Sequence, residues 1–302
     1  MNTEPTNTNG FNKVILLVVI IIVIAGILSN IYLWNREVEP QQQDQTVTET
    51  SEDTSDDFLN LRGDIEEPTI QYPVPEESVP VEDLEAESVE ETSHEDTVLK
   101  KEPLPALDES DESVKQSLLE ISGSLRLEEL FIFDSFIRHF VVTIDNMTGK
   151  KLPQRYVFTA KPADKFSVIK QVETEEIWLD EKNFNRYNAF INLAQKIDMK
   201  QAVKFYVRFY PLFQQAYQDL GYPGHYFNDR LIKVIDHVLL TPEVQGPIKL
   251  IQPKVFYVFS DQTLENLSAG QKILIRIGPQ NAQIVRTKLK ELRQYLTNLG
   301  KR

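Results

Sequence analysis

Hydrophobic and polar positions divide the chain into regions of different character. A run of 21 uncharged, mostly apolar residues covers positions 14–34. At 1.5 Å rise per residue, this run makes about 31 Å of helix, which matches a hydrocarbon core of roughly 30 Å. Because the backbone in lipid must satisfy its own hydrogen bonds, a helix is the expected form of a single span. The pattern predicts a transmembrane helix over 14–34, with the lipid bilayer as its partner.

A cleaved signal peptide is the alternative interpretation of this run. We favour an anchor because the run is longer than a signal-peptide core and no small-residue cleavage site follows it. Lys13 on one side and Arg36 on the other discriminate poorly between the two orientations. Residues 1–13 form only a short head, which signal anchors usually keep in the cytosol. We predict a single-pass protein with a cytoplasmic N-terminus, and the inverted topology stays open.

The next region, 35–103, is polar and strongly acidic. Residues 37–98 hold 21 Asp and Glu and one basic residue, which gives a net charge of −20. Apolar content is too low to offset the entropy of ordering, so we predict a disordered, proline-containing linker. One apolar patch, Phe58, Leu59 and Leu61, interrupts the acidic run. It is a candidate docking motif that folds on a partner, although a plain spacer is the simpler interpretation.

From residue 104 to 302 the pattern becomes that of a folded domain. Apolar residues at helical spacing alternate with short extended runs, which predicts a mainly α fold with a small β component (α+β). Helices are predicted over 110–122, 124–147, 184–197, 199–220 and 227–240 and from Pro279 onward. Strands are predicted over 165–172, 175–180, 248–251 and 255–259, the first two as a hairpin.

Charge separates this domain from the linker. Residues 113–302 carry 27 basic and 19 acidic groups, a net charge of +8. The domain could therefore be screened by the linker or face an anionic surface, although dispersed surface lysines are the simpler interpretation. The last helix is basic and amphipathic, with Val285, Leu289, Leu292 and Leu296 on one face. We expect it to pack against its own domain rather than on a membrane or a partner helix.

Several strings across the folded region resemble a known family. They are PLPALDESD at 103–111, FVVTIDNM at 140–147, FNRYNAF at 184–190, PLFQQAYQDLGYPGHYFNDRL at 211–231 and VFYVFSDQTLENLSAGQKILIRIGPQN at 255–281. Together they resemble an uncharacterised family of bacterial envelope proteins, domain of unknown function 3014. The resemblance implies a membrane-anchored bacterial protein with an acidic linker. It implies no activity and supplies no catalytic residue.

The search for chemistry gives a short set of candidates. The chain has no cysteine, which excludes thiol catalysis and thiolate metal sites, and it lacks the common nucleotide, hydrolase and zinc-protease motifs. His225 and Asp229, four residues apart near a helix start, could bind a metal or transfer a proton. No third ligand is visible, so a Pro-Gly turn with Asn228 or Asp229 as the helix cap is favoured. We expect no metal and no cofactor.

Two arginines complete the candidate set. Arg208 lies in an aromatic stripe at positions 205, 209, 213 and 217, where its guanidinium could stack on a ring and clamp an anion. Pro211 should kink or restart this helix and leave room for a ligand. Arg276 precedes the last helix, whose free amides could bind an anion. Core packing of the stripe and ordinary helix capping are the favoured interpretations.

The functional hypothesis follows from this layout. We expect an inner-membrane protein that presents a periplasmic, non-catalytic binding or scaffold domain to an envelope protein or polymer. A periplasmic enzyme acting on cell-wall material is the alternative, since catalytic carboxylates leave little trace in a sequence. A domain that binds nucleic acid is the third possibility, and it requires the inverted topology.

Overall fold

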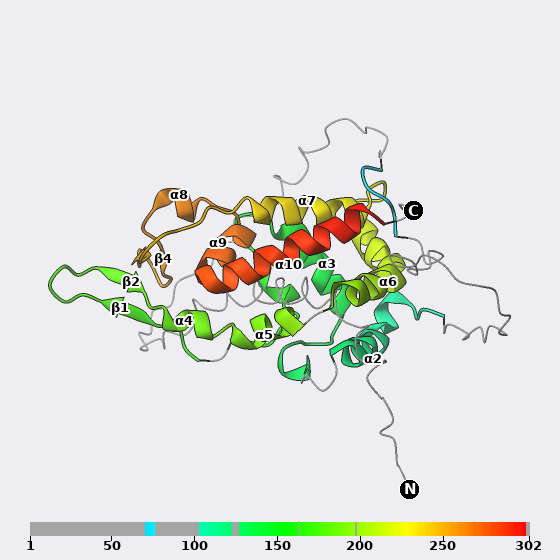
Figure 1. Cartoon of the computed structure of the whole chain (residues 1–302), viewed down its shortest axis with the longest axis horizontal. Helices are drawn as coiled ribbons and strands as arrows, with labels where there is room; N and C mark the ends of the chain where they lie inside the picture. The colour runs from blue at the N-terminus through cyan, green and yellow to red at the C-terminus, as the bar shows by residue number, and fades with distance from the viewer. Residues whose placement is uncertain (1–69, 76–102, 123–126, 163, 197, 300–302) are drawn as a thin grey trace, which may run out of the picture.

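The computed structural model describes residues 70–75, 103–122, 127–162, 164–196 and 198–299. They form a mainly helical domain with one small antiparallel sheet, which confirms the predicted α+β class (Figure 1). The predicted span 14–34 and the candidate motif of Phe58, Leu59 and Leu61 lie outside the described residues. Within the described ranges, no helix has both the length and the apolar character needed to cross a bilayer.

Four long helices make the body of the domain: α3 (Phe136–Asn146), α6 (Met199–Asp219), α7 (Phe227–Leu239) and α10 (Pro279–Thr297). The helix α3 packs against α6 and α7, and α10 packs across α5 (Asn188–Lys196), α6 and α7. The remaining helices are α2 (Asp111–Ser122), α4 (Lys182–Asn185), α8 (Gln262–Glu265) and α9 (Ala269–Arg276). Single 3-10 turns occur at η2 (Leu107–Glu109), η3 (Leu127–Glu129) and η4 (Gln154–Tyr156).

Aromatic side chains fill the space between these helices. The largest fully buried side chains are Tyr187, Phe136, Phe140, Phe158, Phe190, Phe209, Phe213, Phe227 and Phe259. Phe140 of α3 lies with its ring centroid 5.3 Å from that of Phe213 on α6 and 6.3 Å from that of Phe227 on α7. These contacts join three helices at one point of the core, because rings in offset or edge-on contact fill large volumes with favourable geometry.

The sheet lies at one end of the helical body (Figure 1). Its strands are β1 (Val168–Lys170), β2 (Ile177–Leu179), β3 (Lys249–Ile251) and β4 (Val258–Phe259), paired antiparallel in that order. The predicted hairpin is therefore present. Leu179, Leu250 and Phe259 form a second, smaller core with Ile275 of α9. This core joins the sheet to the helices.

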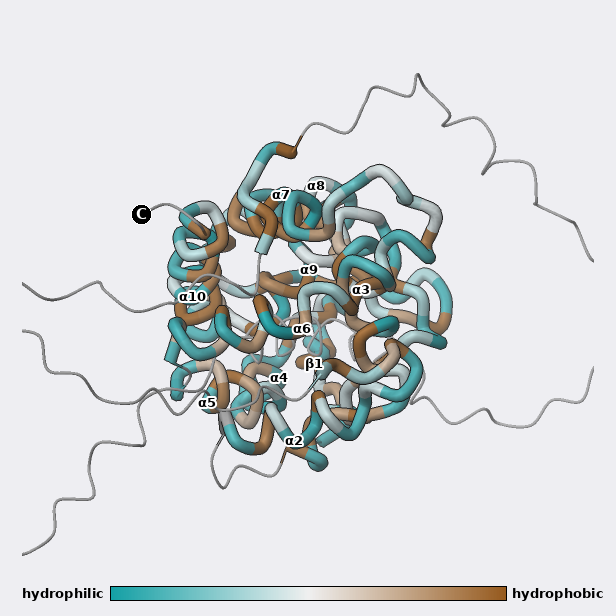
Figure 2. The backbone as a smooth tube through the Cα atoms, turned by 90° about the vertical axis from the view of Figure 1, so that its right-hand side faces the viewer, coloured by the Kyte–Doolittle hydropathy of each residue, from teal (hydrophilic) through white to brown (hydrophobic). Residues whose placement is uncertain are grey.

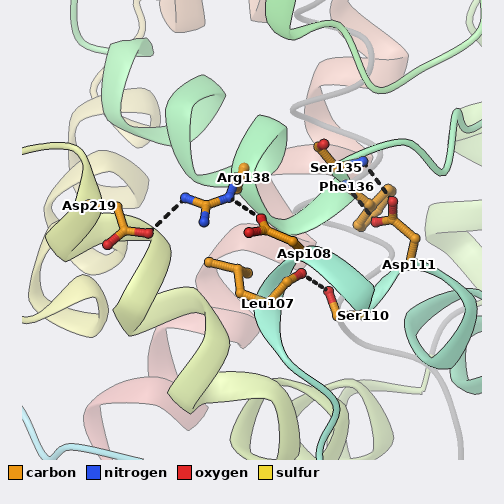
Figure 3. Close-up of polar contacts among 8 residues, drawn as sticks. All are labelled: Leu107, Asp108, Ser110, Asp111, Ser135, Phe136, Arg138 and Asp219. Carbon is orange, nitrogen blue, oxygen red and sulfur yellow. Dashed lines mark hydrogen bonds and ion pairs between the residues drawn. The ribbon is translucent and has the colours of Figure 1, made fainter.

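The region 124–147 differs from the single helix that its apolar pattern predicts. Phe131 forms a β-bridge with Thr159, and α3 begins only at Phe136, after Ser135 with a φ of 50°. The carboxylate of Asp111 on α2 accepts hydrogen bonds from the backbone N–H of Ser135 at 2.7 Å and of Phe136 at 2.8 Å (Figure 3). A capping group from another helix thus sets where α3 starts, and a local pattern does not contain that information.

An arginine on α3 links the turn η2 to the end of α6. Arg138 on α3 pairs with Asp108 of η2 and with Asp219 at the end of α6, each at 2.7 Å (Figure 3). Asp108 holds the pKa of Arg138 above its ordinary value through a hydrogen bond. The pairs are solvent-exposed, so they fix the geometry of this corner more than they stabilise it.

The helices predicted over 110–122, 199–220 and 227–240 and from Pro279 hold with small shifts at the ends, whereas the predicted helix 184–197 is divided between α4 and α5. The helix α6 continues through Pro211, so the predicted restart there is wrong. Val285, Leu289, Leu292 and Leu296 of α10 are buried against α5, α6 and α7, as expected for a helix packed on its own domain. The short helix α8 and the helix α9 were not predicted.

Candidate functional site

Residues 70–75 lie against the helical body of the domain, and we call this segment the strap. Figure 1 shows the strap in cyan beside the N-terminal end of α7 and the C-terminal end of α10. Figure 2, viewed from that end of the molecule, shows it passing between the two helices. Tyr72 and Val74 pack against the main core, and Pro75 is buried. The prediction of a disordered linker over 35–103 therefore does not hold for these six residues.

Two adjacent side chains at the start of α7 hold the backbone of the strap. The carboxylate of Asp229 accepts hydrogen bonds from the backbone N–H of Gln71 at 3.1 Å and of Tyr72 at 3.0 Å. The amide of Asn228 donates to the carbonyl of Pro73 at 2.9 Å. Asn228 is fully buried and Asp229 is 8 % exposed. Buried polar groups need partners, and here the strap supplies them.

The groove around the strap is built by α6. The hydroxyl of Tyr206 donates to Oδ1 of Asn228 at 3.3 Å, which turns the amide nitrogen of Asn228 toward the strap. Gln214 accepts from the backbone N–H of Phe227 at 2.8 Å and donates to the carbonyl of His225 at 2.8 Å. Gln214 therefore satisfies the free backbone groups at the start of α7.

This arrangement changes the expected role of Asn228 and Asp229. The turn before α7 was expected to be closed by one of them as the helix cap. Tyr226 is the N-cap residue and makes no side-chain cap bond, and Gln214 of α6 does the capping. The two polar side chains are thereby left to bind the strap. The carboxylate also lies in the first turn of α7, where the helix dipole favours negative charge.

Electrostatics in the groove keep the hydroxyl groups protonated. Burial raises the pKa of Tyr206 and of Tyr210 well above their ordinary value, and the nearby charge of Asp229 adds to both shifts. Both groups therefore remain neutral hydrogen-bond donors. On the α10 side, Arg293 donates hydrogen bonds to the carboxylate of Asp236, which raises the pKa of Arg293, and Tyr72 contributes in the same direction. We use the name strap groove for Tyr206, Asn228 and Asp229.

The predicted pair of His225 and Asp229 does not form one site. The side chain of His225 is exposed in the turn, with its ring 6.2 Å from that of Tyr222, whereas Asp229 is buried and bound to the strap. In the described parts of the chain, no group of three or more His, Asp or Glu is placed to hold a metal ion.

The predicted arginines lie elsewhere. Arg208 is half-buried, its guanidinium carbon is 5.6 Å from the centroid of Phe209, and its Nε has no hydrogen-bond partner within the described residues. The aromatic stripe beside it is entirely buried, which confirms the core interpretation. Arg276 ends α9 with its guanidinium carbon 5.0 Å from the centroid of Phe259. Burial lowers the pKa of Arg276, while Glu265 and Tyr187 oppose the shift.

The helix start after Arg276 has no side-chain cap, so the expected ordinary capping is wrong there. The amide of Asn281 donates to the carbonyls of Phe184 at 3.1 Å and of Ile277 at 3.0 Å. Gly278 has a φ of 85°, and a Cβ there would lie 2.5 Å from the ring of Phe184. The chain is thus closely packed where the anion site was suggested.

A cleft of about 670 Å³ lies at the opposite end of α7 and α10 from the strap. Trp178 and Ile169 of the sheet, Phe184, Pro242 and Arg286 are among the residues that line it. Arg286 is already engaged, since it donates to the carbonyls at the end of α7, Leu239 at 2.9 Å and Thr241 at 2.5 Å. None of the predicted site residues lines this cleft.

Sequence reasoning missed the strap and the roles of Tyr206, Asn228 and Gln214. One signal was available: residues 68–75, PTIQYPVP, carry no charge, although the surrounding residues 37–98 have a net charge of −20. An uncharged window with a tyrosine, an isoleucine and a valine is the part of such a linker that gains most from burial. The partner residues carried no local signal, because they lie 155–158 positions away in the sequence.

The fold and the strap groove define a small α+β domain, mainly helical, that holds residues 71–73 of its own chain by their backbone. Residues 136–293 match the family described as Protein of unknown function (DUF3014), and the chain belongs to that family. The matched region contains the whole strap groove but not the strap. No curated protein and no solved structure matches the chain.

Proposed function

We propose that this protein is a non-catalytic binding or scaffold protein of the bacterial envelope and that the strap groove is its recognition site. The observation that carries the proposal is the seated strap, whose backbone makes three hydrogen bonds with Asn228 and Asp229. Contacts to backbone N–H and carbonyl groups give affinity for any extended chain, and pockets for side chains add specificity.

The contacts of the candidate residues support binding over catalysis. His225, Arg208 and Arg276 lie apart from Asp229, and the Asp229 carboxylate is occupied by two backbone donors. A carboxylate that accepts two such bonds is held in one orientation. Such a carboxylate can bind a polypeptide backbone through two N–H groups.

The proposed placement rests on the sequence. Residues 14–34 anchor the chain in the inner membrane, residues 1–13 stay in the cytoplasm, and the linker presents the domain in the periplasm. Single cysteines at Ser93 and Gly300 test this topology in a chain that has no other cysteine. Labelling of intact cells by a thiol reagent that does not cross the inner membrane is the expected result. Labelling only after that membrane is opened would contradict it.

Site-specific photo-crosslinking tests the binding function in cells. Lys233 is exposed on α7, one turn after Asp229, so a photoreactive residue there should crosslink whatever occupies the groove. We expect an intramolecular product with the strap and an adduct with a second polypeptide, which increases when residues 70–75 are replaced by a Gly-Ser sequence. Lys204, exposed on α6 and outside the lining of the cleft, is the control position. If Lys233 gives no more intermolecular product than Lys204, the proposed function is wrong.

A further inference from the structure

We propose that the strap groove recognises a partner segment of one particular pattern: a non-proline residue, an aromatic residue, proline, an apolar residue, and proline. The strap itself, Gln71 to Pro75 in this pattern, is then a resident competitor for the partner. This inference rests on the proposed function and names the chemistry of the partner.

The first two positions are restricted by the carboxylate of Asp229. It accepts from the backbone N–H of Gln71 and of Tyr72, so both positions need an N–H group. Proline has none and is excluded from both. The side chain of Gln71 is exposed, so its identity is free, whereas Tyr72 is half-buried against the main core. An aromatic ring at the second position fills that space.

The positions of residues 73 and 75 favour proline, for a reason unrelated to the Asp229 carboxylate. Position 73 contributes only its carbonyl, which accepts from Asn228, so the missing N–H of a proline loses no contact. Pro75 is buried. Proline fixes φ near −65° and limits the conformations of the segment before it binds, which lowers the entropy lost on docking. The pattern therefore has two components. One is the set of backbone groups to which the groove makes hydrogen bonds, and the other is the backbone conformation that fits the groove.

The separation of strap and groove in the chain makes competition possible. Residues 76–102 join the strap to the first described residue of the domain, Pro103, and the groove lies within the family region without the strap. A tethered ligand acts at an effective concentration of about 1 mM. If the free segment binds with a Kd of about 10 µM, the strap weakens partner binding about 100-fold.

A peptide-binding measurement on the full chain tests the pattern. The probe is a fluorescent peptide of residues 68–77, and the chains, in detergent micelles, are the intact protein and a variant with residues 70–75 replaced by Gly-Ser. We expect saturable binding to the variant and at least tenfold weaker binding to the intact chain. Thermal unfolding of both chains checks that the variant is folded. If it is not, Tyr72→Ala in the otherwise intact chain weakens the strap and takes its place.

A matched control peptide tests the specificity. Methylation of the Tyr72 amide nitrogen removes one donor to Asp229 and leaves every side chain in place. A bond to a charged group contributes enough to predict at least a tenfold loss of affinity. Equal binding of the two peptides would overturn the proposed pattern, and so would a folded strap variant that does not bind the unmodified peptide.

The two proposals can fail separately. If the peptide does not bind but Lys233 still crosslinks a second polypeptide in cells, the pattern is wrong and the binding function stands. If both results are negative, the strap serves only the fold of its own chain, and both proposals fall.

Discussion

Replacing Asp229 by asparagine should loosen the strap without unfolding the domain. The carboxylate accepts from two backbone N–H groups, at 3.1 Å and 3.0 Å. Asparagine has the same shape but one oxygen and one NH2 group. The NH2 group would face a backbone donor, so one of the two hydrogen bonds is lost and replaced by two opposed donors.

The magnitude follows from the kind of bond that is lost. A hydrogen bond to a charged group contributes about 1.5–3 kcal/mol. At 1.4 kcal/mol per factor of ten, the docking equilibrium of the strap should weaken by about 10- to 150-fold. The apolar contacts of Tyr72 and Val74 remain. The variant should therefore dock its strap more weakly, while the helical core stays intact.

Amide hydrogen exchange measures this directly. The exchange of the Gln71 and Tyr72 amides in the native protein reports the opening of the strap. Both amides should exchange about 10- to 150-fold faster in Asp229→Asn, in proportion to the docking equilibrium. Glu243→Gln is the control, because it removes the same charge from an exposed residue beyond the other end of α7. Unchanged protection in Asp229→Asn would refute the argument that this carboxylate holds the strap.

Three further predictions concern the fold. Gly278→Ala should lower the free energy of unfolding by at least about 2 kcal/mol, because the φ of Gly278 is 85° and the new Cβ would meet the Phe184 ring. A urea titration equal to that of the wild type would contradict this. Tyr206→Phe should cost about 1–3 kcal/mol in the same assay, since it removes the donor to the buried Oδ1 of Asn228; a stability equal to wild type would exclude that role. Burial lowers the pKa of His139 below its ordinary value of 6.5, so the unfolded state binds a proton first and stability falls as the pH drops below 6.5. His139→Gln should reduce that loss in urea titrations between pH 6.5 and about pH 5, and an unchanged slope would disprove it.

The helices that sequence reasoning placed well carry their signals locally. The helix α6 is capped by Asp198, which accepts from the backbone N–H of Lys200, and α10 starts at Pro279 after Gly278. Apolar residues recur at helical spacing in both. The helix α3 was extended too far because its cap, Asp111, is supplied from 25 positions away. Pro211 did not break α6, since its exposed ring lies in a helix whose other face is held by aromatic packing.

The sequence by itself determined the apolar run at 14–34, the acidic linker, the mainly helical character of the domain and its family. These features depend on composition, periodicity and neighbours a few residues apart. Only the tertiary structure decided that Asp229 faces the strap rather than His225, because the two groups it binds are 157 and 158 positions away. A carboxylate at a helix start has many possible partners within the chain. Packing of α6, α7 and α10 brings one of them, the backbone of residues 71 and 72, within hydrogen-bonding distance.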